Sequence, residues 1–122
     1  MQTLATCLVL IVIIEHFFIM YLEICKIPSS QAARIFGLPI EFLQQKSVQV
    51  LFSNQGLYNG FLATGLAWAY FFAPQVARTD ASILFLGFVI LAAIWGAITS
   101  NPAILIKQGL PAVLALLAVL LI

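Results

Sequence analysis

The sequence predicts an all-α integral membrane protein folded as a four-transmembrane-helix bundle. Of its 122 residues, 64% are hydrophobic and 7% are charged. A soluble domain carries about 25% charged residues, so this chain could not cover a surface that faces water. The apolar residues fall into four runs, and a hydrocarbon core needs roughly 20 apolar residues per helix. We expect one transmembrane domain over residues 1–122, with spans at about 3–25, 48–72, 81–99 and 103–122.

The first span holds three ionisable side chains, with Glu15 and His16 near its middle and Glu23 near its end. It lacks a basic leading region and a small-residue cleavage site, and its apolar run is too long for a signal peptide. We therefore expect residues 3–25 to form a retained helix. Ionisable groups inside a membrane are costly, which makes them candidates for a functional site.

Residues 26–47 form the one polar stretch of any length. Ser29 or Ser30 can cap a short helix over 31–36, which Gly37 can close. Pro39 can start a second helix at its first turn. The wet side of that helix would carry Glu41, Gln44, Gln45 and Lys46. We expect this second piece to be a short amphipathic interfacial helix between the first two spans.

Turn residues separate the later spans. Trp68 and Tyr70 lie near the end of the second span, as interfacial aromatic residues do. Thr79 or Asp80 can cap the third span, and Pro102 can open the fourth. The fourth span is interrupted by Lys107, Gln108, Gly109 and Pro111.

The distribution of positive charge predicts the orientation. Lys26, Arg34 and Lys46 lie in the first loop, and Lys107 can reach the same side by snorkelling. The opposite side has only Arg78 and the terminal amine. This asymmetry places the loop 26–47 in the cytoplasm and both termini outside.

Composition also limits the partners. The net charge of +1 gives no reason to expect nucleic acid, so the expected partner is the lipid bilayer. Cys7 and Cys25 lie too far apart along one helix to form a disulfide, and their spacing matches no metal site. No cofactor motif is present, and a bis-histidine haem would need a second histidine besides His16. The identity of any cofactor is left open.

The second span carries a polar stripe in the segment NQGLYNG. The stripe consists of Asn54, Gln55, Tyr58 and Asn59, which cover an arc of roughly 140°. Gly56 and Gly60 fall on another face in a small-xxx-small pattern, which lets a neighbouring helix approach closely. That neighbour can be a helix of this chain or of a second copy, so a homo-oligomer is one option.

Depth along the helices predicts which polar groups meet. With Lys26 and Lys46 at a common boundary, Glu15 and His16 lie roughly 15–17 Å deep. On the returning helix, Gln55, Tyr58 and Asn59 lie at about 13, 18 and 20 Å. We therefore expect a polar cavity between the first two spans. Glu23 lies only about 4–5 Å deep, where it can snorkel or pair with a lysine.

Three functions fit such a cavity. In the first, the protein binds or transports a small polar or amphipathic ligand, and Glu15 with His16 takes up and releases a proton. In the second, it is a membrane enzyme or an oxidoreductase subunit with Glu15 and His16 as acid and base and the amides as oxyanion donors. In the third, it is a structural or assembly protein, and the amide hydrogen bonds only join helices.

Several strings resemble a known family. EHFFIMYLE, the FGLP turn, NQGLYNGFLATGL and KQGLPA together resemble a family of small four-helix bacterial membrane proteins described only as a domain of unknown function. The resemblance covers essentially the whole chain and implies a location in the bacterial inner membrane. It supplies no activity. The signature positions that it implies are Glu15, His16, Tyr21, Glu23, Asn54, Gln55, Tyr58 and Asn59.

A second likeness is an analogy only. Small multidrug resistance transporters are also four-helix chains of this size with a glutamate midway along the first helix. Glu15 matches that placement, but His16 and the polar stripe of the second span have no counterpart there.

Overall fold

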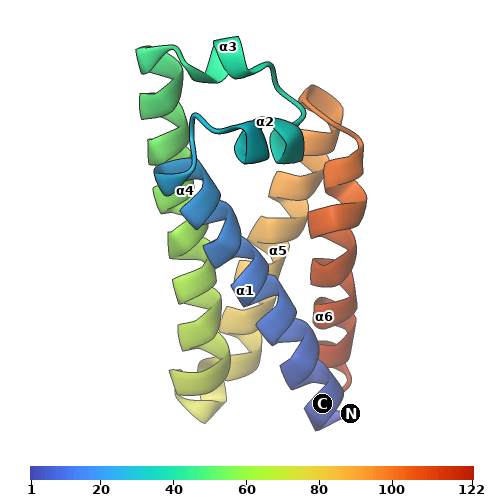
Figure 1. Ribbon diagram of the computed structural model, residues 1–122. Helices are drawn as coiled ribbons and strands as arrows, with labels where there is room; N and C mark the ends of the chain where they lie inside the picture. The colour runs from blue at the N-terminus through green and yellow to red at the C-terminus, as the bar shows by residue number, and fades with distance from the viewer. The chain divides into compact units, whose positions relative to one another are not determined.

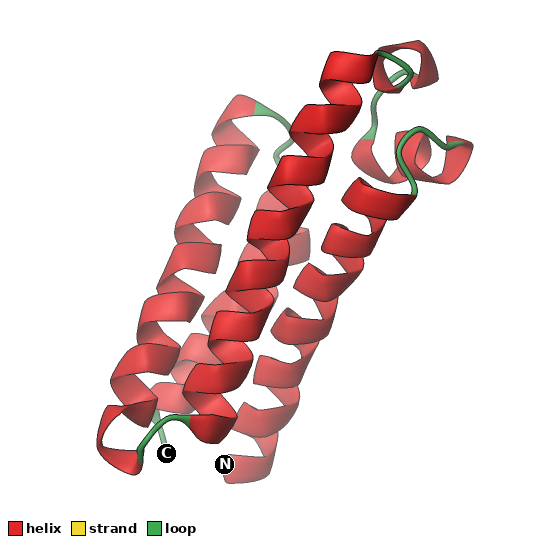
Figure 2. Cartoon of the chain, turned by 90° about the vertical axis from the view of Figure 1, so that its left-hand side faces the viewer, coloured by secondary structure: helices red, strands yellow, loops and turns green.

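The computed structural model describes residues 1–122, and it contains helices joined by short loops and no strands (Figure 2). The chain divides into two compact units. Unit 1 consists of Met1–Glu15 and Leu62–Ile122, and unit 2 consists of His16–Phe61. Two long helices, α1 (Gln2–Cys25) and α4 (Lys46–Ala67), contribute residues to both units. The all-α prediction is confirmed, and the single domain over residues 1–122 stays a prediction.

Unit 1 is built around a core of aliphatic side chains. It contains the start of α1, the end of α4, the π-helical turn η1 (Trp68–Phe72), α5 (Gln75–Thr99), the π-helical turn η2 (Leu105–Gly109) and α6 (Leu110–Leu120). Helices α5 and α6 lie side by side (Figure 1). The buried cluster includes Val9, Val12, Leu66, Leu86, Val89, Ala115 and Val119. Both termini belong to unit 1, and they lie at the same end of it (Figure 1).

The third predicted helix begins earlier than the sequence suggested. We expected Thr79 or Asp80 to cap a helix from residue 81, but α5 starts at Gln75 with Pro74 as its N-cap. Proline fits a helix start because its fixed φ and missing N–H cost nothing there. The Arg78 guanidinium also donates to the Ala73 carbonyl over 3.2 Å, which satisfies an acceptor at the turn.

The expected interruption of the fourth helix is a widened turn. Leu105–Gly109 is π-helical, and the Leu110 N–H donates to the Leu105 carbonyl. Pro111 cannot donate an N–H in an ordinary α-helical turn, and its ring would crowd the preceding carbonyls. The π-helical turn gives the proline room, so the helical path continues from Leu105 to Leu120.

Tyr70 has a structural role that its sequence position did not reveal. We expected Trp68 and Tyr70 to be interfacial aromatic residues, and Trp68 is exposed. Tyr70 is buried instead, and its hydroxyl lies 2.9 Å from Thr6 Oγ1. A buried phenol normally finds a hydrogen-bond partner, and here the partner lies in the first turns of α1.

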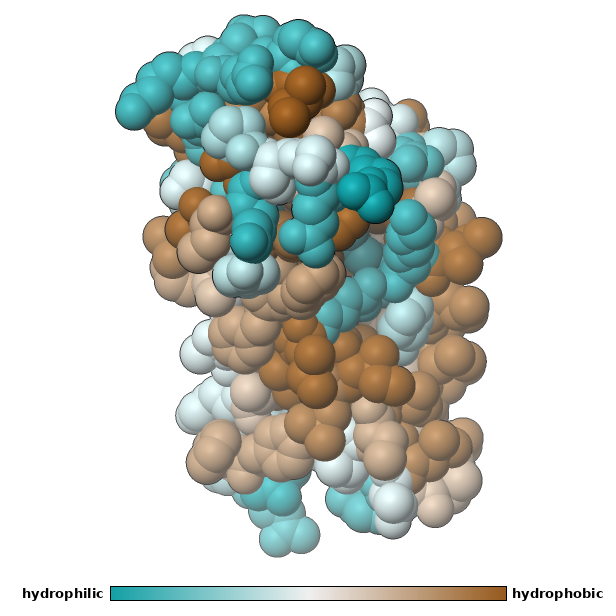
Figure 3. Space-filling view, viewed as in Figure 1, coloured by the Kyte–Doolittle hydropathy of each residue, from teal (hydrophilic) through white to brown (hydrophobic).

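Unit 2 holds the connection between α1 and α4. Ser29 caps α2 (Ser30–Phe36) by accepting the Ala32 N–H at 3.1 Å, and Gly37 closes it with φ +66°. Both features agree with the expected cap residues. The second piece, α3 (Ile40–Leu43), is a single turn with Pro39 as its N-cap, and Lys46 already begins α4. It is therefore shorter than the amphipathic helix that we expected. Hydrophilic residues gather around α3 (Figure 3).

Two helices, α1 and α5, are long and apolar enough to cross a membrane. Leu105–Leu120 forms a shorter apolar helix. Much of the apolar surface in unit 1 is not covered by protein, and the region over α6 is largely hydrophobic (Figure 3). The exposed large side chains of α5 and α6 include Leu84, Phe88, Leu91, Trp95, Ile98, Leu110, Leu114 and Leu117.

Two glycines of unit 1 allow a matched test of its packing. A Cβ added at Gly65 would collide with the ring of Phe85, whereas one added at Gly87 would meet no atom within 4 Å. Phe85 is also held edge-to-face against Phe88. We expect Gly65→Ala to lower the free energy of unfolding by about 1–3 kcal/mol. Chemical denaturation of the purified protein measures this change.

Gly87→Ala is the control. It should leave stability unchanged or raise it by up to about 1 kcal/mol, because alanine is the better helix former. Equal losses in the two variants would contradict the packing of Gly65 against Phe85.

Candidate functional site

A buried carboxyl group lies where the end of α1 packs on α4 in unit 2. Glu23 is 2% exposed. Its Oε1 accepts a hydrogen bond from Asn59 Nδ2 at 3.2 Å and another from Gln55 Nε2 at 3.4 Å. Its Oε2 is buried and has no hydrogen-bond partner. We call Glu23, Gln55 and Asn59 the Glu23 cluster.

Two glycines bring the helices close enough for these contacts. Gly56 and Gly60 are both buried. A Cβ added at Gly56 would lie 2.9 Å from Glu23 Cβ, and one at Gly60 would collide with Met20 Sδ. The missing side chains let α1 settle directly on α4, as small residues do between membrane helices. The amides that flank this glycine stripe can then reach the carboxylate.

The register of the two helices differs from the common boundary assumed for Lys26 and Lys46. Glu23 lies two residues before the end of α1, whereas Gly56 lies ten residues after the start of α4. Helix α4 therefore extends beyond α1 by roughly 12 Å. The connection contains α2 and α3 rather than a tight turn, so nothing holds the two helix ends level. For this reason the amides reach Glu23, which the depth argument had placed near the boundary.

The predicted polar stripe of α4 is divided between two environments. Gln55 and Asn59 border the glycine stripe and bond to Glu23. Tyr58 is 61% exposed and stacks edge-to-face on Phe61. Asn54 is also exposed, and it faces a groove. The arc of roughly 140° is too wide for one neighbouring helix to contact all four side chains.

The groove runs along the other side of the contact between α1 and α4. Its volume is about 610 Å³, and Glu23 forms part of its lining. Four aliphatic side chains and four polar side chains complete the wall. They are Ile24, Ile27, Val50 and Leu57, with Lys46, Gln49, Ser53 and Asn54. The groove is thus amphipathic, and Glu23 is one of its lining residues.

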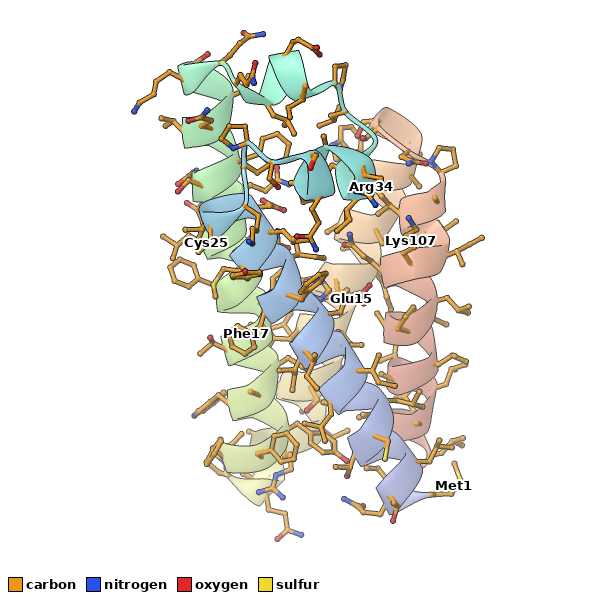
Figure 4. The ribbon with its side chains drawn as sticks, in the orientation of Figure 1. Met1, Glu15, Phe17, Cys25, Arg34 and Lys107 are labelled. Carbon is orange, nitrogen blue, oxygen red and sulfur yellow. The ribbon has the colours of Figure 1, made fainter.

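Glu15 and His16 fall at the boundary between the two compact units. Glu15 lies midway along α1 in unit 1, and its Oε2 is buried without a hydrogen-bond partner (Figure 4). His16 is 2% exposed and belongs to unit 2. Acid–base chemistry by this pair stays a prediction.

The Glu23 cluster can accept a further hydrogen bond. Oε1 is occupied by two neutral amide donors, and Oε2 keeps its bonding capacity. A carboxyl oxygen left unpaired in a buried position costs free energy, which a proton or an N–H or O–H donor can relieve. Within residues 1–122, no group of three or more His, Cys, Asp and Glu residues could hold a metal ion.

Comparison with known proteins assigns the chain to a family. Residues 10–120 match the family described as "Protein of unknown function (DUF1304)". The chain belongs to this family. The matched range, residues 10–120, includes every residue of the Glu23 cluster and of the groove.

One relative in the comparison is similar over nearly its whole length. The "Uncharacterized protein YpaA" of Lactococcus lactis subsp. lactis (strain IL1403) is 42% identical over 118 residues. The alignment covers 97% of this chain and 98% of that protein. No solved structure matches the chain. The predicted membership of an uncharacterised family of small bacterial proteins is therefore confirmed, and it brings no activity with it. The signature positions stay a prediction.

Sequence reasoning did not single out two polar residues of the groove, Gln49 and Ser53, or its aliphatic residues. A signal for them was present, because Lys46, Gln49, Val50, Ser53 and Leu57 recur at helical spacing on one face of α4. Glu23 itself was a candidate. Its contact with Gln55 and Asn59 could be predicted only with knowledge of how α1 is shifted along α4.

The hydrogen bonds of the cluster can be tested against a matched asparagine. Asn59→Ala removes a donor to Glu23, and we expect the free energy of unfolding to fall by about 0.5–2 kcal/mol. Asn54→Ala, one turn away on the exposed side, should cost much less. Chemical denaturation compares the two variants, and an equal cost for both would contradict the cluster.

Proposed function

We propose that this protein is a multi-pass membrane protein of four spans that binds a small amphipathic ligand at the Glu23 cluster. The spans would be α1, α4 with η1, α5, and η2 with α6. Support for the membrane comes from the low charge of the chain, the length of α1 and α5, and the uncovered apolar surface of unit 1. A water-soluble monomer rarely exposes an apolar patch of more than a few hundred Å².

The proposed topology places the loop 26–47 in the cytoplasm and both termini outside. It is supported by the lysines and the arginine of that loop and by the position of both termini at one end of unit 1 (Figure 1). A bacterial inner membrane fits the bacterial source of the relative.

Cysteine labelling tests this topology. In a background with Cys7 and Cys25 changed to serine, a membrane-impermeant maleimide should label Gln2→Cys and Ile122→Cys in intact spheroplasts. Glu41→Cys should react only after the membrane is permeabilised. Labelling of Glu41→Cys from outside would contradict the orientation, and equal labelling of all three before permeabilisation would contradict the membrane barrier.

Ligand binding is supported above all by the unpaired Oε2 of Glu23 beside the groove. Membrane proteins rarely keep an ionisable side chain inside a spanning helix without a use for it. A ligand with an N–H or O–H donor would complete the hydrogen bonding of the carboxyl group. Its apolar part would pack on the aliphatic wall of the groove. Without ligand, the same carboxyl group can hold a proton.

A structural role is the second candidate. The bonds from Gln55 and Asn59, next to the close contact at Gly56, join α1 to α4. Such bonds contribute only about 0.6 kcal/mol each in membranes. Helix joining uses Oε1 alone, however, and gives no role to Oε2 or to the polar wall of the groove. Binding accounts for both.

An amine probe distinguishes binding from helix joining. We expect octylamine to bind the protein in nanodiscs, and octyltrimethylammonium to bind at least several-fold more weakly because it has no N–H donor. Isothermal titration measures both affinities. Glu23→Gln should abolish the difference between the two amines.

Glu41→Gln is the control, because Glu41 is exposed on α3 and does not line the groove. It should leave both affinities as they are. Equal binding of the two amines to the unaltered protein would overturn the ligand proposal and leave the structural role.

A further inference from the structure

An acidic and a basic side chain lie toward the two ends of the groove. Glu23 lies at the level of Gly56, and Lys46 is the first residue of α4. Both side chains line the groove. We infer that the ligand is a zwitterionic chain molecule, with a primary ammonium group at Glu23 and an anionic group at Lys46. This inference rests on the proposed binding at Glu23 and adds the chemical class of the ligand.

The spacing of the charges requires a ligand with a chain between its ends. Gly56 follows Lys46 by ten residues, which is roughly 15 Å of helix. An amino acid with adjacent charged groups is too short to pair with both residues. A flexible chain of several methylene groups can span the distance that remains between the ends of the Glu23 and Lys46 side chains.

The wall between the two charges suits such a chain. Ile27 and Val50 supply aliphatic surface between the levels of Lys46 and Glu23, and Ile24 and Leu57 continue it toward the buried end. Methylene groups packed there are removed from water, at about 0.8 kcal/mol for each fully buried group. Gln49, Ser53 and Asn54 provide polar groups in the same lining.

The charges also argue against other occupants. A simple alkylamine leaves Lys46 without an anion, and a fatty acid places no donor on Glu23 Oε2. A metal ion would find one carboxylate and no second acidic or imidazole ligand in the groove lining. Opposite charges at the two ends therefore select both the class and the direction of the ligand.

Lys26 provides a matched control for Lys46. It follows α1 in the same unit, but it does not line the groove. Its Nζ lies 5.9 Å from the centre of the Tyr21 ring, which is a cation–π arrangement. Removing this charge changes the net charge of the protein by the same amount without touching the groove.

The test uses ω-aminooctanoate, octylamine and octanoate with the protein in nanodiscs of neutral lipid. Isothermal titration gives the affinity of each probe for the unaltered protein and for Lys46→Gln, Lys26→Gln and Glu23→Gln. We expect Lys46→Gln to lower the affinity for ω-aminooctanoate by roughly three- to tenfold, which is the size expected for an exposed ion pair. The affinity for octylamine should not change. Lys26→Gln should change neither affinity, and Glu23→Gln should lower the affinities for both amines.

The outcomes separate this inference from the function on which it rests. If octylamine binds through Glu23 and Lys46→Gln does not weaken ω-aminooctanoate, the zwitterion is wrong and the binding site stands. If Glu23→Gln weakens neither amine, both proposals fall. Tighter binding of octanoate than of ω-aminooctanoate would also overturn the inference, because it would assign the groove to a fatty acid. Circular dichroism checks that each variant is folded, and Glu23→Met, which also removes the carboxyl group, replaces Glu23→Gln if the latter is not.

Discussion

The close contact of α1 with α4 at Gly56 and Gly60 is the constraint on which the site depends. Because neither residue has a side chain, the Cβ of Glu23 lies directly against the backbone of α4. That contact buries the carboxyl group and places it within reach of Gln55 and Asn59. A larger residue at Gly56 would collide with Glu23 Cβ and the Met20 carbonyl, which would separate the helices and expose the carboxyl group. The same helix contact therefore determines both the packing of unit 2 and the hydrogen bonding of Glu23.

The hydrogen bonding of Glu23 is asymmetric, and the proposed binding site rests on this asymmetry. One carboxyl oxygen receives two amide donors, and the other receives none. A group that only joined helices would gain by satisfying both oxygens, since an unpaired buried acceptor costs free energy. The groove beside Glu23 is where a missing donor can enter. Lys46 adds a positive charge to the lining of the same groove.

The proposed membrane setting would make these features unusual. In water, a carboxyl group and two amides would be unremarkable, because solvent would satisfy them. Glu23 lies on α1, which is long and apolar enough to cross a bilayer, and inside a bilayer its carboxyl group would need partners within the protein. A surrounding bilayer would also explain why large apolar side chains on α5 and α6 remain uncovered. Membership in a family described as of unknown function leaves this physical reading as the main guide to activity.

Composition and local pattern alone determined that the chain is helical, where its four long helical stretches lie, and that Ser29 and Gly37 cap the first short helix. These properties depend on residues close together in the sequence. The π-helical turn before Pro111 and the burial of Tyr70 depended on tertiary neighbours or on backbone adjustments that the pattern does not encode. The register of α1 against α4 decided that Gln55 and Asn59 bond to Glu23. Sequence spacing gives the distance along each helix, but only the packed structure decides how far one helix slides past another, and here that placed Glu23 against Gly56.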